Sequence, residues 1–520
     1  MNHVLILPIL VPLCCACLLL LMRRDNVTAA RGLALLSSSI QLVIAGLLLA
    51  QSSGGAIQLY TLGSWLPPHG IVLVVDRLAA LMLCTTAVLA LPALLYAANG
   101  ADRRGKYFHA LWQFQLLGIN GAFLTGDLFN LFVFFEVLLM ASYGLLLHGQ
   151  GAARLRAGLQ YVVLNLVGSA LFLIAAGIFY GLAGTLNFAD LSVFIAVAEP
   201  ADAPLLGAAG LLLLVVFGLK AALFPWYFWL PRSYAVASAP VAALFAIMTK
   251  VGIYAILRLA LLLFGAHAGA LAGLLLPWLW PLAVLTLVLG SLGVLAATTL
   301  TELIGYCVVV SVGTLLSALA LNSVAALTAL LYYLLQSTWS IGALFLLVDL
   351  IADRRGSVAG RLQSGPKIAS HVWLGSLFLI GAVAVVGLPP LAGFVGKLML
   401  LQAAPLPDTA ILWLALLVSS SMGLVAFSRA GSMVFWRVEA VPAARMTLPI
   451  YAVSAVLMLL GTNVALSICA APIAKVLEAT ATQLFDAEQY TAAVLMQAQN
   501  PATSEQGEPN NESRAMRVEP

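Results

Sequence analysis

Long uninterrupted runs of apolar residues follow one another along most of the chain, separated by short polar segments. A run of about 20 apolar residues can cross a bilayer as a helix. Each run is continuous rather than alternating, which favours helices over the strands of a barrel. We therefore predict an all-α polytopic membrane protein with about fourteen transmembrane helices, at residues 3–22, 30–51, 72–98, 107–125, 128–148, 158–183, 204–230, 237–263, 271–296, 301–320, 324–350, 372–403, 410–434 and 448–475.

Composition supports this prediction. Hydrophobic residues make up 63% of the 520 residues and charged residues only 8%, against about 25% charged residues in a typical soluble domain. This excludes a soluble enzyme, a nucleic-acid binder and a disordered protein. The net charge of +4 is also too small to indicate a polyanionic partner. The surroundings that the chain contacts are therefore expected to be membrane lipid, not nucleic acid.

The two ends of the sequence differ in character. The apolar run at residues 2–22 has no basic residue before it, and Arg23, Arg24 and Asp25 follow it in place of a small-residue cleavage site. We interpret it as a retained first helix and not as a signal peptide. Residues 497–520 are rich in Asn, Gln, Glu, Pro and Ser, which predicts a disordered polar tail.

Basic residues alternate between the loops and predict the orientation of the chain. Loops after even-numbered helices are nearly free of Lys and Arg. Those after odd-numbered helices carry Arg23, Arg24, Arg31, Arg103, Arg104, Lys106, Arg154, Arg156, Arg232, Arg354, Arg355, Arg361, Lys367, Arg437 and Arg445. Because basic loops stay in the cytoplasm, both termini are expected on the non-cytoplasmic side.

Once loop charges are set aside, four charged residues stand out deep inside the predicted helices: Glu136, Lys220, Lys250 and Lys397. A charge in the middle of a bilayer costs at least about 2.5–3.5 kcal/mol, so such residues usually face the protein interior and mark ion or proton paths. A buried Glu–Lys pair can hold or release a proton according to whether the pair is closed or parted. The alternative is a static salt bridge that clamps helices together.

Prolines interrupt two of the predicted helices close to these lysines. Pro225 follows Lys220 in the seventh helix, and Pro389 and Pro390 precede Lys397 in the twelfth. Paired broken helices at corresponding positions are typical of inverted-repeat transporters, although a proline kink can also serve packing alone. We predict an N-terminal three-helix unit at 1–106, inverted five-helix repeats at 107–264 (helices 4–8) and 265–436 (helices 9–13), and helix 14 with a C-terminal segment at 437–496.

Three motifs carry a resemblance to a known family. The segment Lys220–Tyr234 (KAALFPWYFWLPRSY), the pair Ala239–Pro240 and the segment Met248–Tyr254 (MTKVGIY) resemble the signature of the antiporter-like subunit superfamily. That superfamily includes proton-pumping membrane subunits of respiratory complex I and large subunits of Mrp-type cation/proton antiporters. Within it, the segment Gly70–Leu78 (GIVLVVDRL) is most similar to the D-type subunits of Mrp/Pha antiporters.

The resemblance implies roles for the matching residues. Glu136 and Lys220 would form a coupled pair, Lys250 the central proton relay, and Lys397 the relay of the second half-channel. Relatives often carry a basic residue in helix 11, where this chain has only neutral polar groups. Gln336 and Ser337 would therefore line the channel through water, as would Tyr254 of the signature, unless Gln336 and its tyrosine neighbours satisfy one another.

The function implied is a subunit of a bacterial, multi-pass inner-membrane antiporter that exchanges protons for Na⁺ or K⁺. The resemblance implies partner subunits of the A, B, C, E, F and G types, no enzymatic activity and no cofactor. One alternative is a proton-pumping subunit of an NADH–quinone oxidoreductase or membrane hydrogenase, and another is an assembly scaffold with vestigial charges. No metal-binding motif is present. Asp349 is the one conspicuous further acid in the membrane interior, while Asp127 and Glu302 lie near predicted helix ends.

Overall fold

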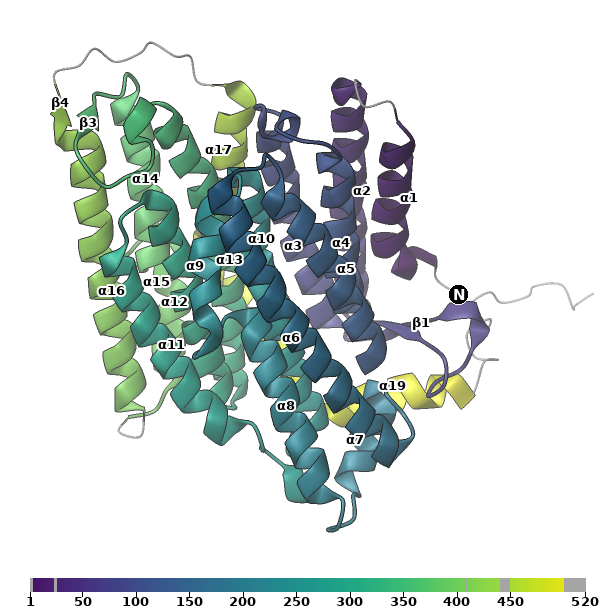
Figure 1. The fold of residues 1–520 in the computed structure, drawn as a ribbon. Coiled ribbons are helices and arrows are strands. Elements are labelled where there is room, and N and C mark those ends of the chain that lie inside the picture. The colour runs from purple at the N-terminus through teal and green to yellow at the C-terminus, as the bar shows by residue number, and fades with distance from the viewer. Residues whose placement is uncertain (1–2, 23–25, 407–408, 440–448, 500–520) are drawn as a thin grey trace, which may run out of the picture.

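The computed structural model describes residues 3–22, 26–406, 409–439 and 449–499, which form a bundle of helices (Figure 1). Within these ranges, twelve helical segments are long and apolar enough to cross a membrane. The predicted all-α polytopic membrane fold is therefore confirmed. The count of fourteen is not, because α4 has 17 residues, and α14 and α15, with 16 and 12, are also too short to count as separate spans.

The N-terminal part contains three long helices and a hairpin. Its elements are α1 (Leu7–Leu21), α2 (Val27–Ser52), β1 (Gln58–Thr61), β2 (Val72–Val75) and α3 (Arg77–Ala97). The prediction of a helix from residue 72 was wrong, because β-branched residues of β2 pair in antiparallel fashion with β1. Asp76 then begins α3 as its N-cap, accepting a hydrogen bond from the Ala79 backbone N–H at 2.8 Å.

The next part of the chain contains α4 (Phe108–Leu124), α5 (Leu128–Leu147), α6 (Ala152–Ala183), α7 (Phe188–Ala196), α8 (Ala203–Ala221), α9 (Trp229–Val236) and α10 (Ala239–Leu257), which a π-helical turn extends over Arg258–Leu263. The helix α6 begins six residues before the predicted residue 158. The guanidinium of Arg154, on its first turn, donates hydrogen bonds to the backbone oxygens of Val236 and His148. A basic side chain is tolerated there because its charged end reaches polar groups at the edge of the bundle.

A similar succession follows, with α11 (Leu276–Ala296), α12 (Leu300–Ala320), α13 (Val324–Asp353), β3 (Gly365–Pro366), α14 (His371–Val386), α15 (Ala392–Ala403), α16 (Ala410–Gly431), a π-helical turn at Ser432–Trp436 and β4 (Val438–Glu439). Strands β3 and β4 pair in parallel. Each succession thus has a broken helix before its last member. The two inverted five-helix repeats and their boundaries stay a prediction.

The C-terminal part differs from the prediction. Instead of one helix at 448–475, α17 (Ile450–Ile468) ends at Cys469, and α18 (Ala470–Phe485) and α19 (Ala487–Gln499) follow. Figure 1 shows α19 lying across one end of the bundle, close to β1 and α7. Residues 497–499, predicted to be disordered, belong to α19, and residues 500–520 lie outside the described residues.

Both predicted helix breaks are present, and both begin with the same cap. After α8, Ala222 has a φ of 63° and the Leu223 N–H bonds to the Gly218 carbonyl at 2.8 Å. After α14, Gly387 has a φ of 84° and the Leu388 N–H bonds to the Val383 carbonyl at 3.0 Å. A left-handed residue followed by such a bond is the Schellman type of helix end. The two helices therefore stop before their prolines and not at them.

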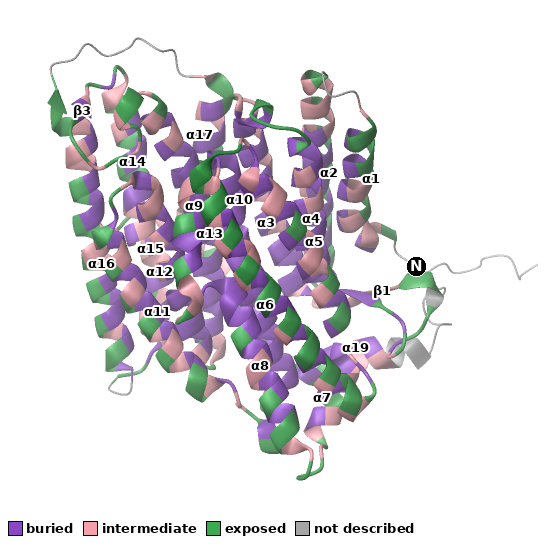
Figure 2. Cartoon of the chain, viewed as in Figure 1, coloured by how far each residue is buried: buried purple, intermediate pink, exposed green. Residues whose placement is uncertain are grey.

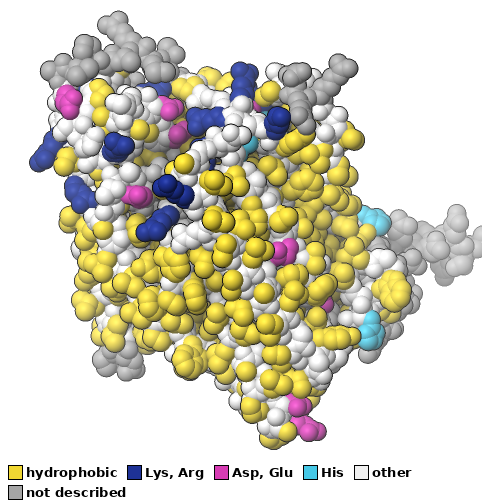
Figure 3. All heavy atoms as spheres, viewed as in Figure 1, with side chains coloured by type: hydrophobic (Ala, Val, Ile, Leu, Met, Phe, Trp, Pro, Cys, Tyr) yellow, Lys and Arg dark blue, Asp and Glu magenta, His cyan; other side chains and the backbone are white. Residues whose placement is uncertain are grey.

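The core of the bundle lies along α10 and α13 (Figure 2). Every residue of α10 is buried, whereas α6 and α16 present many exposed leucines and valines. In Figure 3, hydrophobic side chains cover the middle of the visible face, and Lys and Arg side chains gather toward its upper end. This distribution is that of a protein surrounded by lipid. The side on which each terminus lies stays a prediction.

Candidate functional site

Lys250 lies at the centre of the bundle. Its side chain, on α10, is fully buried, with 0% exposure. The ammonium group donates hydrogen bonds to Ser311 Oγ of α12 at 3.0 Å and to Thr249 Oγ1 at 3.2 Å. Lys250 is in none of the ion pairs found among the described residues. This amine is therefore held by hydroxyl groups.

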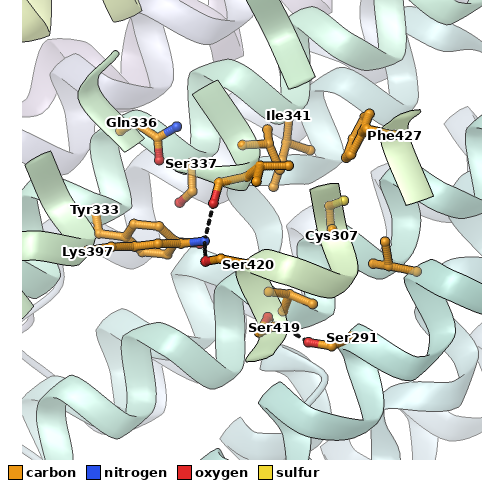
Figure 4. Close-up of a pocket in the computed structure, with 15 residues that line it drawn as sticks. Ser291, Cys307, Tyr333, Gln336, Ser337, Ile341, Lys397, Ser419, Ser420 and Phe427 are labelled. Carbon is orange, nitrogen blue, oxygen red and sulfur yellow. Dashed lines mark hydrogen bonds between the residues drawn. The ribbon is translucent and has the colours of Figure 1, made fainter. Parts of the chain in front are cut away.

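Lys397 lies beside a cavity at the second helix break (Figure 4). It is on α15 and is 8% exposed. Its Nζ donates to the backbone oxygen of Val386, the last residue of α14, at 2.7 Å and to Ser420 Oγ of α16 at 2.8 Å. The cavity measures about 20 Å³, which is enough for one water molecule. The site at Lys397 thus combines a buried amine, a carbonyl at the end of a helix and space for one water molecule.

Gln336 and Ser337 line the same cavity from α13, and their role in lining a channel stays a prediction. The Gln336 amide nitrogen donates to the Ala384 backbone oxygen at 2.8 Å and to Ser340 Oγ at 2.9 Å. Gln336 Oε1 is buried and has no hydrogen-bond partner among the described residues. The alternative, in which Gln336 and its neighbouring tyrosines satisfy one another, is therefore not what the structure contains.

Glu136 and Lys220, the pair expected to be coupled, are not in contact. Lys220 is buried near the end of α8, and its Nζ lies 4.9 Å from the centre of the Phe135 ring, with no hydrogen-bond partner in the described part of the chain. Glu136, on α5, is only partly buried and accepts a hydrogen bond from Ser169 of α6. The carboxylate and the amine are thus parted in this structure.

Tyr254, predicted to line the channel, contacts a buried ion pair on the same face of the helix as Lys250. Its hydroxyl donates to the Phe123 backbone oxygen at 2.7 Å and accepts from Arg258 Nε at 3.1 Å. Arg258 forms a buried ion pair with Asp76, with 2.7 Å between Nη2 and Oδ2, beneath the ring of Tyr490 on α19. Lys250, Tyr254 and Arg258 occur every fourth residue along α10, so they share one face of the helix.

Several of these contacts could not be assigned from the sequence analysis. Arg258 lies inside the predicted span 237–263 and meets the criterion of an intramembrane charge, so the sequence did contain a signal for it. Ser311 and Ser420, which contact Lys250 and Lys397, carry no such signal, because serine is common in membrane helices. Only the packing of α12 and α16 identifies them.

One face of α12 meets the surroundings of both hydroxyl-bound lysines. Ser311 contacts Lys250, and Cys307, one turn earlier on α12, lines the Lys397 cavity. The hydrogen bonds of Lys250 and those of Lys397 involve different residues. The structure thus brings Lys397, Gln336 and Ser337 together, and Lys250 meets the same face of α12 one turn further along.

The break prolines and the remaining acids lie away from these amines. Pro225, Pro389 and Pro390 are all exposed. Asp127 caps α5, and Glu302, on the first turn of α12, accepts from the Thr298 hydroxyl at 2.8 Å. Burial raises the pKa of Asp127 above its usual range.

Asp349, the remaining acidic candidate, is near the end of α13. It accepts a hydrogen bond from the Tyr96 hydroxyl at 2.8 Å. No group of three or more His, Cys, Asp or Glu side chains that could hold a metal occurs within the described ranges.

These features define the class of protein. A helical bundle with an apolar surface buries three lysines, and two of them adjoin breaks in membrane-spanning helices. Ionisable groups kept in such positions are typical of membrane proteins that move ions or protons. The fold and the site together are those of a polytopic membrane transporter.

The particular family follows from comparison with known proteins. Residues 125–424 match the model of the transmembrane family described as NADH:quinone oxidoreductase/Mrp antiporter, and the chain belongs to that family. The matched range contains Glu136, Lys220, Lys250 and Lys397.

Individual relatives agree with this assignment. A probable D-type subunit of a K⁺/H⁺ antiporter from Rhizobium meliloti is 40% identical, over 95% of this chain and 98% of the relative. The D-type subunit of the Na⁺/H⁺ antiporter of Bacillus subtilis is also 40% identical, over 84% of this chain and 88% of the relative. A chain of the Mrp complex from a Dietzia species superimposes with a TM-score of 0.84 at 26% identity, covering 95% of this chain and 100% of that one. A chain of respiratory complex I from Thermus thermophilus shares the fold, with a TM-score of 0.76 and 24% identity over 93% of this chain.

Proposed function

We propose that this chain is the D-type subunit of a multisubunit antiporter that exchanges protons for Na⁺ or K⁺. The observation that carries the proposal is the match at 40% identity, over nearly the whole of both chains, to a D-type antiporter subunit. The buried lysines support it, because an amine held by hydroxyls inside a membrane bundle can exchange a proton with water that reaches it.

Each lysine has a role in the proposed path. Lys250 takes up a proton from a half-channel, and Lys397 passes it to the second half through water beside Gln336 and Ser337. Glu136 and Lys220 control the transfer by closing and parting. The membrane potential adds about 2.3 kcal/mol per charge per 100 mV to the driving force.

The surroundings of the chain follow from the same proposal. Its partners are the other hydrophobic subunits, of the A, B, C, E, F and G types, in a bacterial cell membrane. Both termini lie on the non-cytoplasmic side, as the alternation of basic loops predicts. The chain moves ions and is not an enzyme.

The proposal is tested by removing the central amine in the whole complex. Lys250→Ala should abolish cation/proton exchange in everted membrane vesicles, because no other group can hold the proton at that position. The matched control is Lys475→Ala, which removes an exposed lysine and should leave exchange unchanged. Co-purification of the partner subunits checks that the complex still assembles. Normal exchange by the Lys250→Ala complex would overturn the relay role and favour a scaffold.

The alternative, a subunit of a redox-driven proton pump, is supported by the shared fold with complex I. Purification of the native assembly separates the two functions. Flavin or iron–sulfur absorbance in the purified assembly would favour the redox complex. An assembly of small, colourless hydrophobic subunits would favour the antiporter.

A further inference from the structure

The carbonyl group of Val386 is left free by the break after α14. In an uninterrupted helix it would accept from the backbone nitrogen four residues later, but that residue is Pro390, which has no N–H. The free oxygen instead accepts from Lys397 Nζ at 2.7 Å, and Ser420 Oγ accepts from the same nitrogen at 2.8 Å. Two neutral oxygens therefore surround one cationic group.

A third oxygen faces the same cavity. Because the Ala384 carbonyl can only accept a hydrogen bond, the Gln336 side-chain atom that bonds to it must be the amide nitrogen. The orientation of the carboxamide is thereby fixed. Oε1 is left without a partner in the described part of the chain, on a side chain that is 1% exposed. In Figure 4 this oxygen points toward the side of the cavity occupied by Lys397.

The cavity itself suits a small particle with a single charge. Its volume of about 20 Å³ accommodates something the size of one water molecule. No Asp or Glu is among the residues that line it, and its ionisable members are Lys397, Cys307 and Tyr333. Divalent cations usually require carboxylate ligands, whereas carbonyl and hydroxyl oxygens can replace the hydration shell of an alkali cation.

We infer that Val386 O, Ser420 Oγ and Gln336 Oε1 form a binding site for a monovalent alkali cation, and that the Lys397 ammonium group holds the first two of these oxygens in this structure. The flexible lysine stem allows the amine to leave the oxygens. An alkali cation and the ammonium group each carry one positive charge, so the site holds one of them at a time. The inference deepens the proposed function and rests on it, because it places the cation path, and not only the proton path, in this chain.

The test measures equilibrium binding of ⁸⁶Rb⁺ and of ²²Na⁺ to the purified whole complex, without any ion gradient. Lys397→Met removes the competing ammonium group and should raise the affinity for one of these ions at least about tenfold. Adding Gln336→Leu to this variant removes an oxygen ligand and should reverse the gain by about tenfold. Unlabelled Na⁺, K⁺ and Li⁺ as competitors then identify the preferred ion.

Lys475→Met is the control, since it also replaces a lysine by methionine, but an exposed lysine that does not line the cavity. It should leave cation affinity unchanged. If Lys397→Met does not assemble, Lys397→Gln also removes the charge and is used in its place. A cation affinity of the Lys397→Met complex within twofold of that of the Lys475→Met complex would overturn the site, as would a gain that survives Gln336→Leu. Because binding is measured without transport, failure of the site is distinguishable from failure of the exchange activity in the Lys250→Ala test.

Discussion

The two broken helices end in the same way but treat their lysines differently. At the first break, Lys220 precedes the cap, and its amine lies against the Phe135 ring without a hydrogen-bond partner among the described residues. At the second break, Lys397 follows the cap, and its side chain folds back across it. A Cβ atom at Gly387 would meet the Lys397 Cδ at 2.8 Å. The amine thereby reaches a carbonyl that the break has released.

The difference shows that the position of a lysine relative to a break decides its surroundings. A lysine on the turn before the break points into packed side chains, because the carbonyls of its own helix are still hydrogen-bonded there. A lysine on the helix after the break can reach the unpaired carbonyls of the helix before it. A lysine near a proline is therefore the same sequence signal for two kinds of site, one lined by an aromatic ring and one lined by oxygen atoms.

The largest expected effect concerns the stability of the two sites. Lys220→Met should raise the thermal midpoint of the purified complex, because it removes a buried polar group without a hydrogen-bond partner among the described residues, and burying such a group costs about 1–3 kcal/mol. Lys397→Met should lower it, because each hydrogen bond to a charged group contributes about 1.5–3 kcal/mol. Thermal unfolding followed by size-exclusion chromatography measures both midpoints. Shifts of the same sign would show that the two amines are in equivalent surroundings.

A smaller effect is expected at the two left-handed cap residues. Gly387→Ala should destabilise the complex by at least about 1–2 kcal/mol, the usual cost of a left-handed conformation for a residue with a Cβ, and should also displace Lys397 and slow exchange. Ala222→Gly should be neutral or stabilising by up to about 1 kcal/mol, since Ala222 already adopts a φ of 63°. Thermal midpoints and exchange rates of the two variants check this. Equal tolerance of both substitutions would contradict the close approach of Lys397 to Gly387.

The smallest expected effect is on the pH dependence of stability, and it concerns a residue outside the membrane-spanning helices. Burial lowers the pKa of His148, and the nearby Arg154 and Arg104 lower it further, against opposing effects of the Gly105 backbone and Asp102. Because the unfolded pKa is about 6.5, the stabilising contribution of the neutral ring is complete above that pH and is lost as the pH falls. His148→Gln should flatten the stability–pH curve below pH 6.5 by at most about 1.4 kcal/mol per pH unit. An unchanged slope of stability against pH, measured by urea or thermal unfolding, would show that His148 does not contribute to this pH dependence. Any loss of stability at low pH that remains in the His148→Gln variant can then be compared between the variants of the two lysine sites.

Much of the fold was predictable from sequence because membrane helices leave a strong local signal. The helices around residues 128–148 and 324–350 and the two interruptions near Pro225 and Pro389 were placed closely. The start of α3 was misplaced, since Val72–Val75 is equally apolar in a strand and in a helix. The end of α17 at Cys469 was missed although Pro472, on the first turn of α18, is a signal for such a boundary.

The candidate site was less predictable, because its contacts depend on packing between distant segments. The burial of Lys250 and Lys397 could be expected from a charge within an apolar run, and so could the position of Gln336 beside one of them. The parting of Glu136 from Lys220 depends on how α5 rotates against α6 and α8, which no local pattern specifies. The cluster of Tyr254, Arg258 and Asp76 could not be expected for a related reason, since Asp76 lies far away in the sequence. The channel-lining role of Tyr254 stays a prediction.

The Arg77 side chain connects the beginning and the end of the described chain. Its guanidinium donates to the backbone oxygens of Ser52, Ser53 and Ala479, and its backbone N–H donates to Gln483 Oε1. Next to it, Asp76 of the N-terminal part neutralises Arg258 of α10. Fragments cut at the predicted repeat boundaries would therefore contain the buried guanidinium of Arg258 without the carboxylate of Asp76 that neutralises it. A minimal version of this protein has to retain α2, α3 and α18 together, however many of the intervening helices are exchanged or redesigned.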